Sequence, residues 1–189
     1  TPKGKSKAYK IAKNRTASSM LSSPNMSERY VAWQQLHKVG AKAEGTLLEL
    51  WKSDDQRIRA RALHLLARIK GAEKKYINLA LKDNNPDIRI TGIRIARERG
   101  LDVIPFVKKM VNDKDAGVRR ACAIALRHNE SPEAPALWTK LAQQHDGKDR
   151  WYLEALGLAL DKQQDKFFGA WLEAVGSEWD TPAGRDIIW

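Results

Sequence analysis

The sequence of 189 residues predicts an all-α fold, an α-α superhelix (solenoid) of about five stacked helix pairs. Arginine recurs along the chain with steps of 30, 30, 30 and 31 residues, and an asparagine or aspartate precedes each of these arginines by four positions. A period of this length is typical of stacked helix pairs. No segment sustains the period-2 alternation of a half-buried strand. We call the repeated pairs the arginine ladder, which consists of Asn25, Arg29, Asp55, Arg59, Asn85, Arg89, Asp115, Arg119, Asp146 and Arg150.

Residues 1–20 are polar and basic and lack clear periodicity, so we expect a basic linker or lead-in before the repeats. Residues 21–189 are expected to form a single solenoid domain with an atypical C-terminal cap. The chain starts without a methionine and without the apolar stretch of a signal peptide, so we expect a piece of a larger protein. The basic residues at the start are Lys3, Lys5, Lys7, Lys10, Lys13 and Arg15.

Each repeat is expected to contain an Asx turn, a first helix, a break and a second helix. The Asx side chain suits the N-cap of the first helix, and Gly or Asn suits the left-handed residue that follows its end. The first helices are predicted over 26–39, 56–70, 86–99, 116–128 and 147–160. The breaks are predicted at Gly40, Gly71, Gly100, Asn129 and Asp161. The second helices are predicted over 42–52, 73–82, 102–112, 133–144 and 164–176.

Counted from each ladder arginine, positions +3, +4 and +7 share one helical face and are apolar or small in the first four repeats. This face is predicted to pack against neighbouring helices, and it contains the single cysteine, Cys122, which we expect to be a small buried residue. The fifth repeat has Leu153 and Glu154 at the first two of these positions, so we expect it to lie in a different register.

The ladder itself is predicted to be structural. Each Asx side chain is expected to cap a helix, while each arginine reaches the Asp or Asn of the next repeat through charge-assisted hydrogen bonds.

The face opposite the packing face is rich in arginine, in a chain whose formal net charge is +11. Arginine suits forked recognition of carboxylates and phosphates, and solenoids commonly bind partners on such a face. Solvation of a basic surface is the alternative interpretation. We call this candidate partner-binding surface the basic ridge, which consists of Arg61, His64, Arg68, Arg94, Arg97, Arg120 and Arg127.

Seven tryptophans are many for this length. Four of them lie on apolar helical stripes and are expected in the core: Trp33, Trp51, Trp138 and Trp171. The other three, Trp151, Trp179 and Trp189, are expected to pack a C-terminal cap or an adjoining domain. The basic ridge contains no aromatic residue, which weakens the case for base stacking.

Motifs for catalysis and cofactors are absent from the sequence. There is no HExxH, CxxC or His pair at i, i+4, and no GxGxxG, Walker A, GxSxG or CxxCH pattern. Paired carboxylates such as Asp54 and Asp55 lie in repeat turns, where capping explains them. We therefore predict that this segment is not an enzyme, holds no metal or cofactor, and has no membrane span.

The repeats resemble HEAT repeats, most clearly in Asn85-Pro-Asp-Ile-Arg89 and Asp115-Ala-Gly-Val-Arg119. Three segments, Ser23–Trp33, Asp146–Gly157 and Trp179–Trp189, are similar to the HEAT segment of large secreted bacterial proteins labelled membrane-bound dehydrogenases. In that family the HEAT segment connects a sorbosone-dehydrogenase-like propeller to a c-type cytochrome domain. The resemblance implies an extracytoplasmic location, flanking domains of the same polypeptide as partners, and haem c in an adjoining domain.

These observations favour a non-catalytic scaffold or interaction domain of a multidomain protein. The alternative is a basic nucleic-acid-binding protein that resembles the HEAT-like alkylpurine DNA glycosylases, whose basic concave face carries Trp and Asp residues. A third interpretation is a purely structural spacer.

Overall fold

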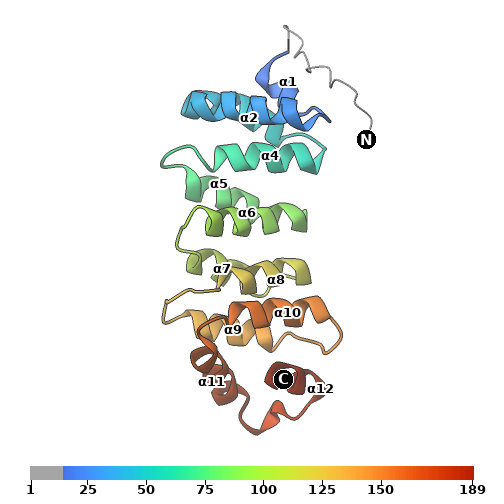
Figure 1. Cartoon of the computed structure of the whole chain (residues 1–189), viewed down its shortest axis with the longest axis vertical. Coiled ribbons are helices and arrows are strands. Elements are labelled where there is room, and N and C mark those ends of the chain that lie inside the picture. The colour runs from blue at the N-terminus through green and yellow to red at the C-terminus, as the bar shows by residue number, and fades with distance from the viewer. Residues whose placement is uncertain (1–14) are drawn as a thin grey trace, which may run out of the picture. The chain divides into compact units, whose positions relative to one another are not determined.

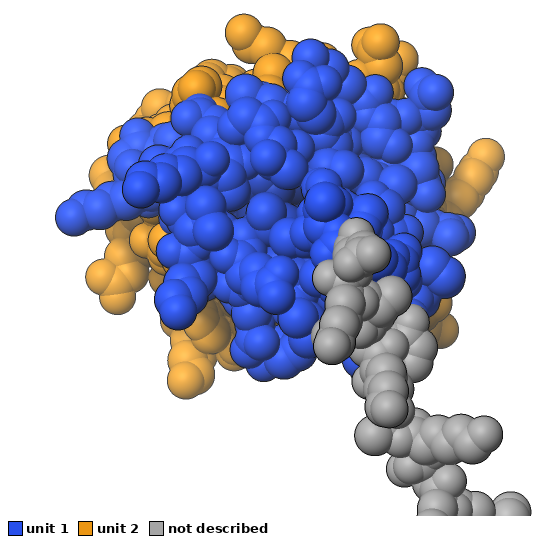
Figure 2. Space-filling view, turned by 90° about the horizontal axis from the view of Figure 1, so that it is seen from above, with its two compact units in different colours: residues 1–73 blue, residues 74–189 orange. Residues whose placement is uncertain are grey.

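The computed structural model describes residues 15–189, and the basic residues predicted to form a linker at positions 1–14 lie outside this range. The described residues form helices joined by loops and contain no strand (Figure 1). Contacts divide the chain into two compact units, residues 1–73 and 74–189, which Figure 2 shows in different colours. We describe each unit by itself, and the single domain expected over 21–189 stays a prediction.

The first unit contains the helices α1 to α4 and one short 3-10 helix. Helix α1 packs against α2, and four of its five residues lie in the stretch predicted as a lead-in, residues 1–20. Its Met20 and Leu21 are buried, so the last part of the predicted lead-in belongs to the packed helices. The elements are α1 (Ala17–Leu21), α2 (Met26–Val39), η1 (Gly40–Ala43), α3 (Glu44–Trp51) and α4 (Gln56–Leu66).

The second unit holds the remaining helices, apart from the first residue of α5. Helices α6, α8 and α10 are successive neighbours, and α9 packs against α11 (Figure 1). The sequence does not predict α12 as a separate helix. The elements are α5 (Glu73–Ala80), α6 (Pro86–Glu98), α7 (Ile104–Met110), α8 (Ala116–Ala125), α9 (Ala134–Ala142), α10 (Arg150–Ala159), α11 (Gln164–Val175), η2 (Gly176–Trp179) and α12 (Pro182–Ile188).

Four of the five predicted caps are present. Asn25, Asp55, Asn85 and Asp115 each accept a hydrogen bond from a backbone N–H in the first turn of the following helix. These bonds satisfy donors that the helix itself leaves unpaired, which explains why the helices begin where the sequence predicts.

The fifth predicted cap is wrong. Asp149, not Asp146, caps α10 by accepting from the amide of Tyr152. Asp146 instead accepts from the amides of Lys148 and Asp149 in a turn before the helix. Gly147 has a φ of +73°, which no α-helix contains, so a helix that starts at residue 147 is excluded.

The breaks after the first helices follow the prediction in three repeats and miss by one residue in two. Gly40, Gly71 and Gly100 all have positive φ. In the later repeats the left-handed residues are His128 and Lys162, where Asn129 and Asp161 were expected.

The predicted packing face forms the core of the helices. Its buried members include Ala62 and Leu63 on α4, Ile93 and Ala96 on α6, and Cys122 on α8. Burial in apolar surroundings raises the pKa of the Cys122 thiol, and nearby Asp113 adds to the shift. The expectation of a small buried cysteine is confirmed.

The tryptophans follow the prediction only in part. Trp138 and Trp171 are buried, whereas Trp33 and Trp51 are half-buried, each beneath an arginine. Trp189 is fully exposed and Trp179 is exposed. The fold class predicted from the sequence is confirmed: within residues 15–189 the structure is all-helical, and the helices pack in neighbouring pairs.

Candidate functional site

The strongest contact of the arginine ladder joins two repeats of the second unit. The Nε and Nη2 atoms of Arg89 each donate to a carboxylate oxygen of Asp113 at 2.8 Å. The two side chains are only 7% and 8% exposed. Burial alone raises the pKa of Asp113, but the hydrogen bonds from Arg89 and from the Asp115 amide outweigh it and lower the pKa below its usual value.

Two other ladder arginines share one part of this arrangement, since Arg89 also donates from Nη1 to the carbonyl oxygens of Asp83 and Asn84. Arg29 donates to the carbonyl oxygens of Ser23 and Pro24, and Arg119 donates to those of Asp113 and Lys114. Arg59 lies over the ring of Trp51, with its guanidinium carbon 5.0 Å from the centroid. The expected contact with an Asp or Asn of the next repeat is present for Arg89, which binds Asp113 rather than the capping Asp115. For Arg59 this contact stays a prediction. Arg29, Arg89 and Arg119 each also close the turn before their own helix.

Arg150 does not belong to the ladder. It is the first residue of α10, its side chain is 84% exposed, and its guanidinium lies 3.4 Å from Glu154. Because α10 is capped by Asp149, the position four residues after the cap is Leu153. The fifth repeat therefore lies in another register, as its sequence indicates, and lacks a ladder arginine.

The basic ridge residues of the first unit are engaged within that unit. Arg61 donates to the carbonyl of Leu21 at 3.0 Å, and desolvation together with Arg29 lowers the pKa of Arg61. Arg68 lies over the Trp33 ring at 5.3 Å, and His64 is half-buried. Arg61 and Arg68 therefore have internal partners that the repeat pattern does not reveal.

The ridge residues of the second unit differ among themselves. Arg127 pairs with Asp161, which also contacts His128, and both partners lower the pKa of the carboxyl. Arg120 lies 3.7 Å from Asp149, a long contact. Arg94 and Arg97 are exposed, and no residue of the described chain forms an ion pair or hydrogen bond with their side chains.

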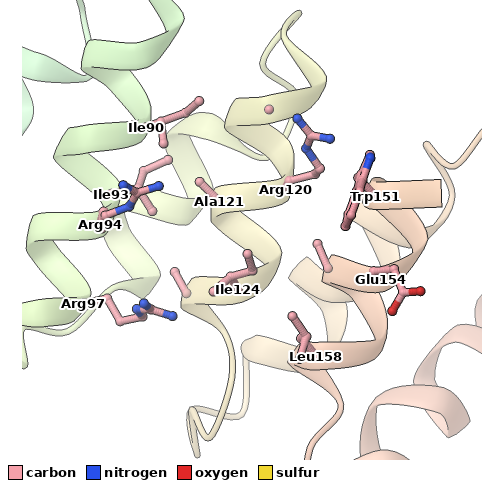
Figure 3. A pocket seen from close by; sticks show the side chains of 13 residues that line it. Ile90, Ile93, Arg94, Arg97, Arg120, Ala121, Ile124, Trp151, Glu154 and Leu158 are labelled. Atoms are coloured by element: carbon pink, nitrogen blue, oxygen red, sulfur yellow. The ribbon is translucent and has the colours of Figure 1, made fainter. Parts of the chain in front are cut away.

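Arg94, Arg97 and Arg120 line one open groove of about 720 Å³ in the second unit (Figure 3). Its lining residues come from α6, α8 and α10, which run in the same direction, from the top of the view toward the bottom. Most of the remaining lining is aliphatic: Ile90, Ile93, Ala121, Ile124, Ala125, Ala155 and Leu158. The predicted ridge thus contributes three of its seven residues to one concave, largely apolar surface.

Trp151 also lines this groove and is 74% exposed. The sequence prediction found no aromatic residue on the ridge and so missed that Trp151 lies beside Arg120 in this groove. The expected packing of Trp151 against a cap or an adjoining domain stays a prediction. The sequence does indicate this position of Trp151 in the groove when residues of α10 are numbered from the cap at Asp149. Trp151 then occupies the position that Gly117 holds in α8, and Glu154 occupies that of Arg120.

Charge changes sign across the groove. Arg94 and Arg97 stand on α6, whereas the only carboxylate among the lining residues is Glu154 on α10. Exposed guanidinium groups without partners bind carboxylates or phosphates, and an aliphatic floor binds apolar side chains. Between residues 15 and 189, no group of three or more His, Cys, Asp or Glu side chains is arranged to hold a metal ion.

Every groove-lining residue except Leu158 lies in a stretch that resembles a known family of repeats. Residues 73–157 match the family model of HEAT repeats, which supports a HEAT-repeat segment there. HEAT repeats commonly mediate protein interactions and are generally non-catalytic, in agreement with the prediction that the segment is not an enzyme. A comparison with curated proteins gives no match. No helix in the described part of the chain combines the length and apolar character needed to cross a membrane.

Proposed function

We propose that this chain is a non-catalytic interaction domain that holds an acidic surface of another protein domain. The observation that carries the proposal is the pair Arg94 and Arg97, two exposed arginines without partners in the described chain, beside an apolar groove of a HEAT-repeat segment. An unpaired guanidinium is strongly attracted to carboxylates, and the nearby apolar surface adds binding free energy when water is excluded.

We further propose that the chain is a scaffold segment of a multidomain extracytoplasmic protein and orients a dehydrogenase-like propeller against a c-type cytochrome domain. The resemblance of its first and last segments to the HEAT segment of such proteins supports this. In this arrangement the haem belongs to the adjoining domain, and the residues described above contribute only docking surfaces. Exposed Trp179, Ile188 and Trp189 offer a second apolar contact at the C-terminal side.

A calorimetric titration tests the scaffold proposal. The chain is titrated with propeller and cytochrome domains that are produced separately. We expect binding of at least one domain, and weaker binding after reversal of charge at Arg94 and Arg97. If neither domain binds, the scaffold proposal is rejected. If reversal of both arginines changes nothing measurable, the chain is only a structural spacer.

A nucleic-acid partner is the second candidate, because exposed Trp151 lies on the same groove as three arginines. Phosphate contacts release counterions, so the logarithm of the affinity falls steeply with the logarithm of salt concentration. Titration with duplex and single-stranded DNA at several salt concentrations separates the two candidates. An affinity for DNA that does not change with salt concentration, or the absence of binding near roughly 50 mM salt, excludes this second candidate.

A further inference from the structure

We propose that the groove between α6, α8 and α10 binds an acidic amphipathic helical segment of a partner protein. Its apolar side chains contact the groove floor, and its carboxylates bind Arg94 and Arg97. The inference deepens the proposed function and rests on it, because the proposed function names only an acidic partner surface. The structure adds the shape, the apolar requirement and the charge order of that surface.

The floor of the groove is suited to apolar side chains. Ile90, Ile124 and Leu158 line the groove from α6, α8 and α10 in turn (Figure 3). Leu158 is 49% exposed and Trp151 is 74% exposed, although both are large apolar residues on a folded surface. The volume of about 720 Å³ lies within the range of roughly 300–1,000 Å³ in which clefts bury most of a ligand. Tryptophan and arginine are the residue types that most often dominate binding at interfaces.

The spacing of the two arginines on α6 matches the spacing of two acidic side chains on one turn of a ligand helix. Arg94 and Arg97 are three residues apart and therefore project from the same face of α6. Two carboxylates placed three or four residues apart on a ligand helix have a similar spacing, about 5–6 Å between Cβ atoms. Each guanidinium presents a planar fork that binds one carboxylate with two hydrogen bonds. An acidic pair on one helix turn therefore matches the two free cations.

The opposite edge of the groove offers acidic groups no unpaired cation. Glu154 lines the groove from α10 and lies 3.4 Å from Arg150, and Arg120 already faces Asp149. The two unpaired arginines therefore stand on the α6 edge alone. A ligand with acidic residues on one edge and neutral residues on the other matches this distribution, so the position of its acids determines which edge lies over α6.

The same features disfavour nucleic acid in this groove. Phosphates on a strand would meet Glu154 on one edge and an aliphatic floor in the centre, and neither binds them. Base stacking on single strands uses several exposed aromatic side chains. Trp151 is the one aromatic residue in the groove lining.

The test uses the full chain and a designed, fluorescently labelled helical peptide. The peptide has a leucine stripe, glutamates along one edge and glutamines along the other. Three related peptides replace the glutamates by glutamine, the glutamates by lysine, or the leucines by alanine. A single-stranded oligothymidylate serves as the nucleic-acid probe, and affinities are measured by fluorescence anisotropy at constant salt.

We expect the acidic peptide to bind, and Arg94→Glu with Arg97→Glu to weaken it at least tenfold, an effect expected when two charge-assisted hydrogen-bonded pairs are lost. The matched control is Arg99→Glu with Lys82→Glu, which changes the net charge equally at exposed positions outside the groove. The lysine-edged peptide is expected to bind the Arg94→Glu, Arg97→Glu protein better than the wild-type protein. Replacement of the leucines is expected to weaken binding tenfold or more.

Three results overturn the inference. One is equal weakening by the groove variant and its control, which would indicate a diffuse charge effect. Another is unchanged binding of the alanine peptide, which would remove the apolar requirement. The third is tighter, Arg94- and Arg97-dependent binding of the oligothymidylate. If the flanking domains bind through Arg94 and Arg97 but the acidic peptide does not bind, this inference fails and the proposed function survives. If the peptide binds but no domain does, the proposed function fails.

Discussion

The two compact units use the same residue types, arginine and tryptophan, in opposite ways. In the first unit, arginines cover tryptophans: Arg59 lies over Trp51 and Arg68 over Trp33. In the second unit, Arg94 and Arg97 have no partner in the described chain, and no cation–π contact within residues 15–189 covers Trp151. Arginine content alone therefore does not identify a binding surface. The informative arginines are those whose hydrogen-bonding groups the fold leaves unused.

The largest difference between the units is expected at equivalent ladder positions. Arg89→Ala removes a buried cation that pairs with Asp113, and breaking a buried ion pair costs about 3–5 kcal/mol of unfolding free energy. Arg29→Ala removes two hydrogen bonds to carbonyl groups at a half-buried site in the first unit, a loss of about 1 kcal/mol. Urea unfolding followed by circular dichroism measures both. Equal losses would show that the buried ion pair does not distinguish the units.

The same ion pair predicts how stability depends on pH. The pKa of Asp113 is lower in the folded chain than the usual unfolded value of about 3.9, so the folded state binds the proton less tightly. The stabilisation is complete above the unfolded pKa and is lost as pH falls through the folded pKa. Asp113→Asn should therefore reduce the dependence of unfolding free energy on pH below about 5. Unchanged dependence on pH in that variant would contradict the assignment. We expect this effect to be smaller than the loss in Arg89→Ala, because protonation retains part of the hydrogen bonding.

A double-mutant cycle tests the cation–π contact of the first unit. Arg68→Ala and Trp33→Ala, made singly and together, should give a coupling energy of about 0.5–1 kcal/mol. The matched cycle in the second unit uses Arg94→Ala and Trp151→Ala, for which we expect no coupling. Similar coupling in both units would remove the contrast between covered and uncovered tryptophans.

The smallest effect is expected for Trp151 alone. Because its side chain is 74% exposed, Trp151→Ala should change the unfolding free energy by no more than about 0.5 kcal/mol. The reference is Trp138→Ala in the same unit, where a buried ring that donates to the Leu156 carbonyl is lost at a cost of about 3–5 kcal/mol. A large loss in Trp151→Ala would show that this residue stabilises the fold and is not free to bind a partner.

Much of the fold follows from the sequence because its determinants are local. Asn85 caps α6 and Gly100 adopts the left-handed conformation after it, as the repeat predicts. Helix α1 escapes prediction, since five residues are too few to show helical periodicity. The start of α10 is missed because Asp146 and Asp149 both satisfy the rule for a cap, and only the backbone at Gly147 decides between them.

The site is less predictable, since it depends on contacts between residues distant in sequence. The exposed position of Arg94 and Arg97 follows from helical periodicity. The partner of Arg61, in contrast, is a carbonyl forty residues away at Leu21, which no repeat pattern reveals. The contribution of Trp151 to the groove depends on the register of α10, and that register cannot be assigned until its cap is known.

The cap at Asp149 has a consequence for how this surface changes during evolution or design. Relative to their caps, Gly117 and Trp151 hold the same position, as do Arg120 and Glu154, and Ile124 and Leu158. A helix turns by 360° in 3.6 residues, so moving the cap by one residue rotates every side chain of α10 by about 100° relative to the groove. A short insertion or deletion before α10 can move the cap. It then changes which side chains of α10 face the groove, although no residue of α10 itself is substituted.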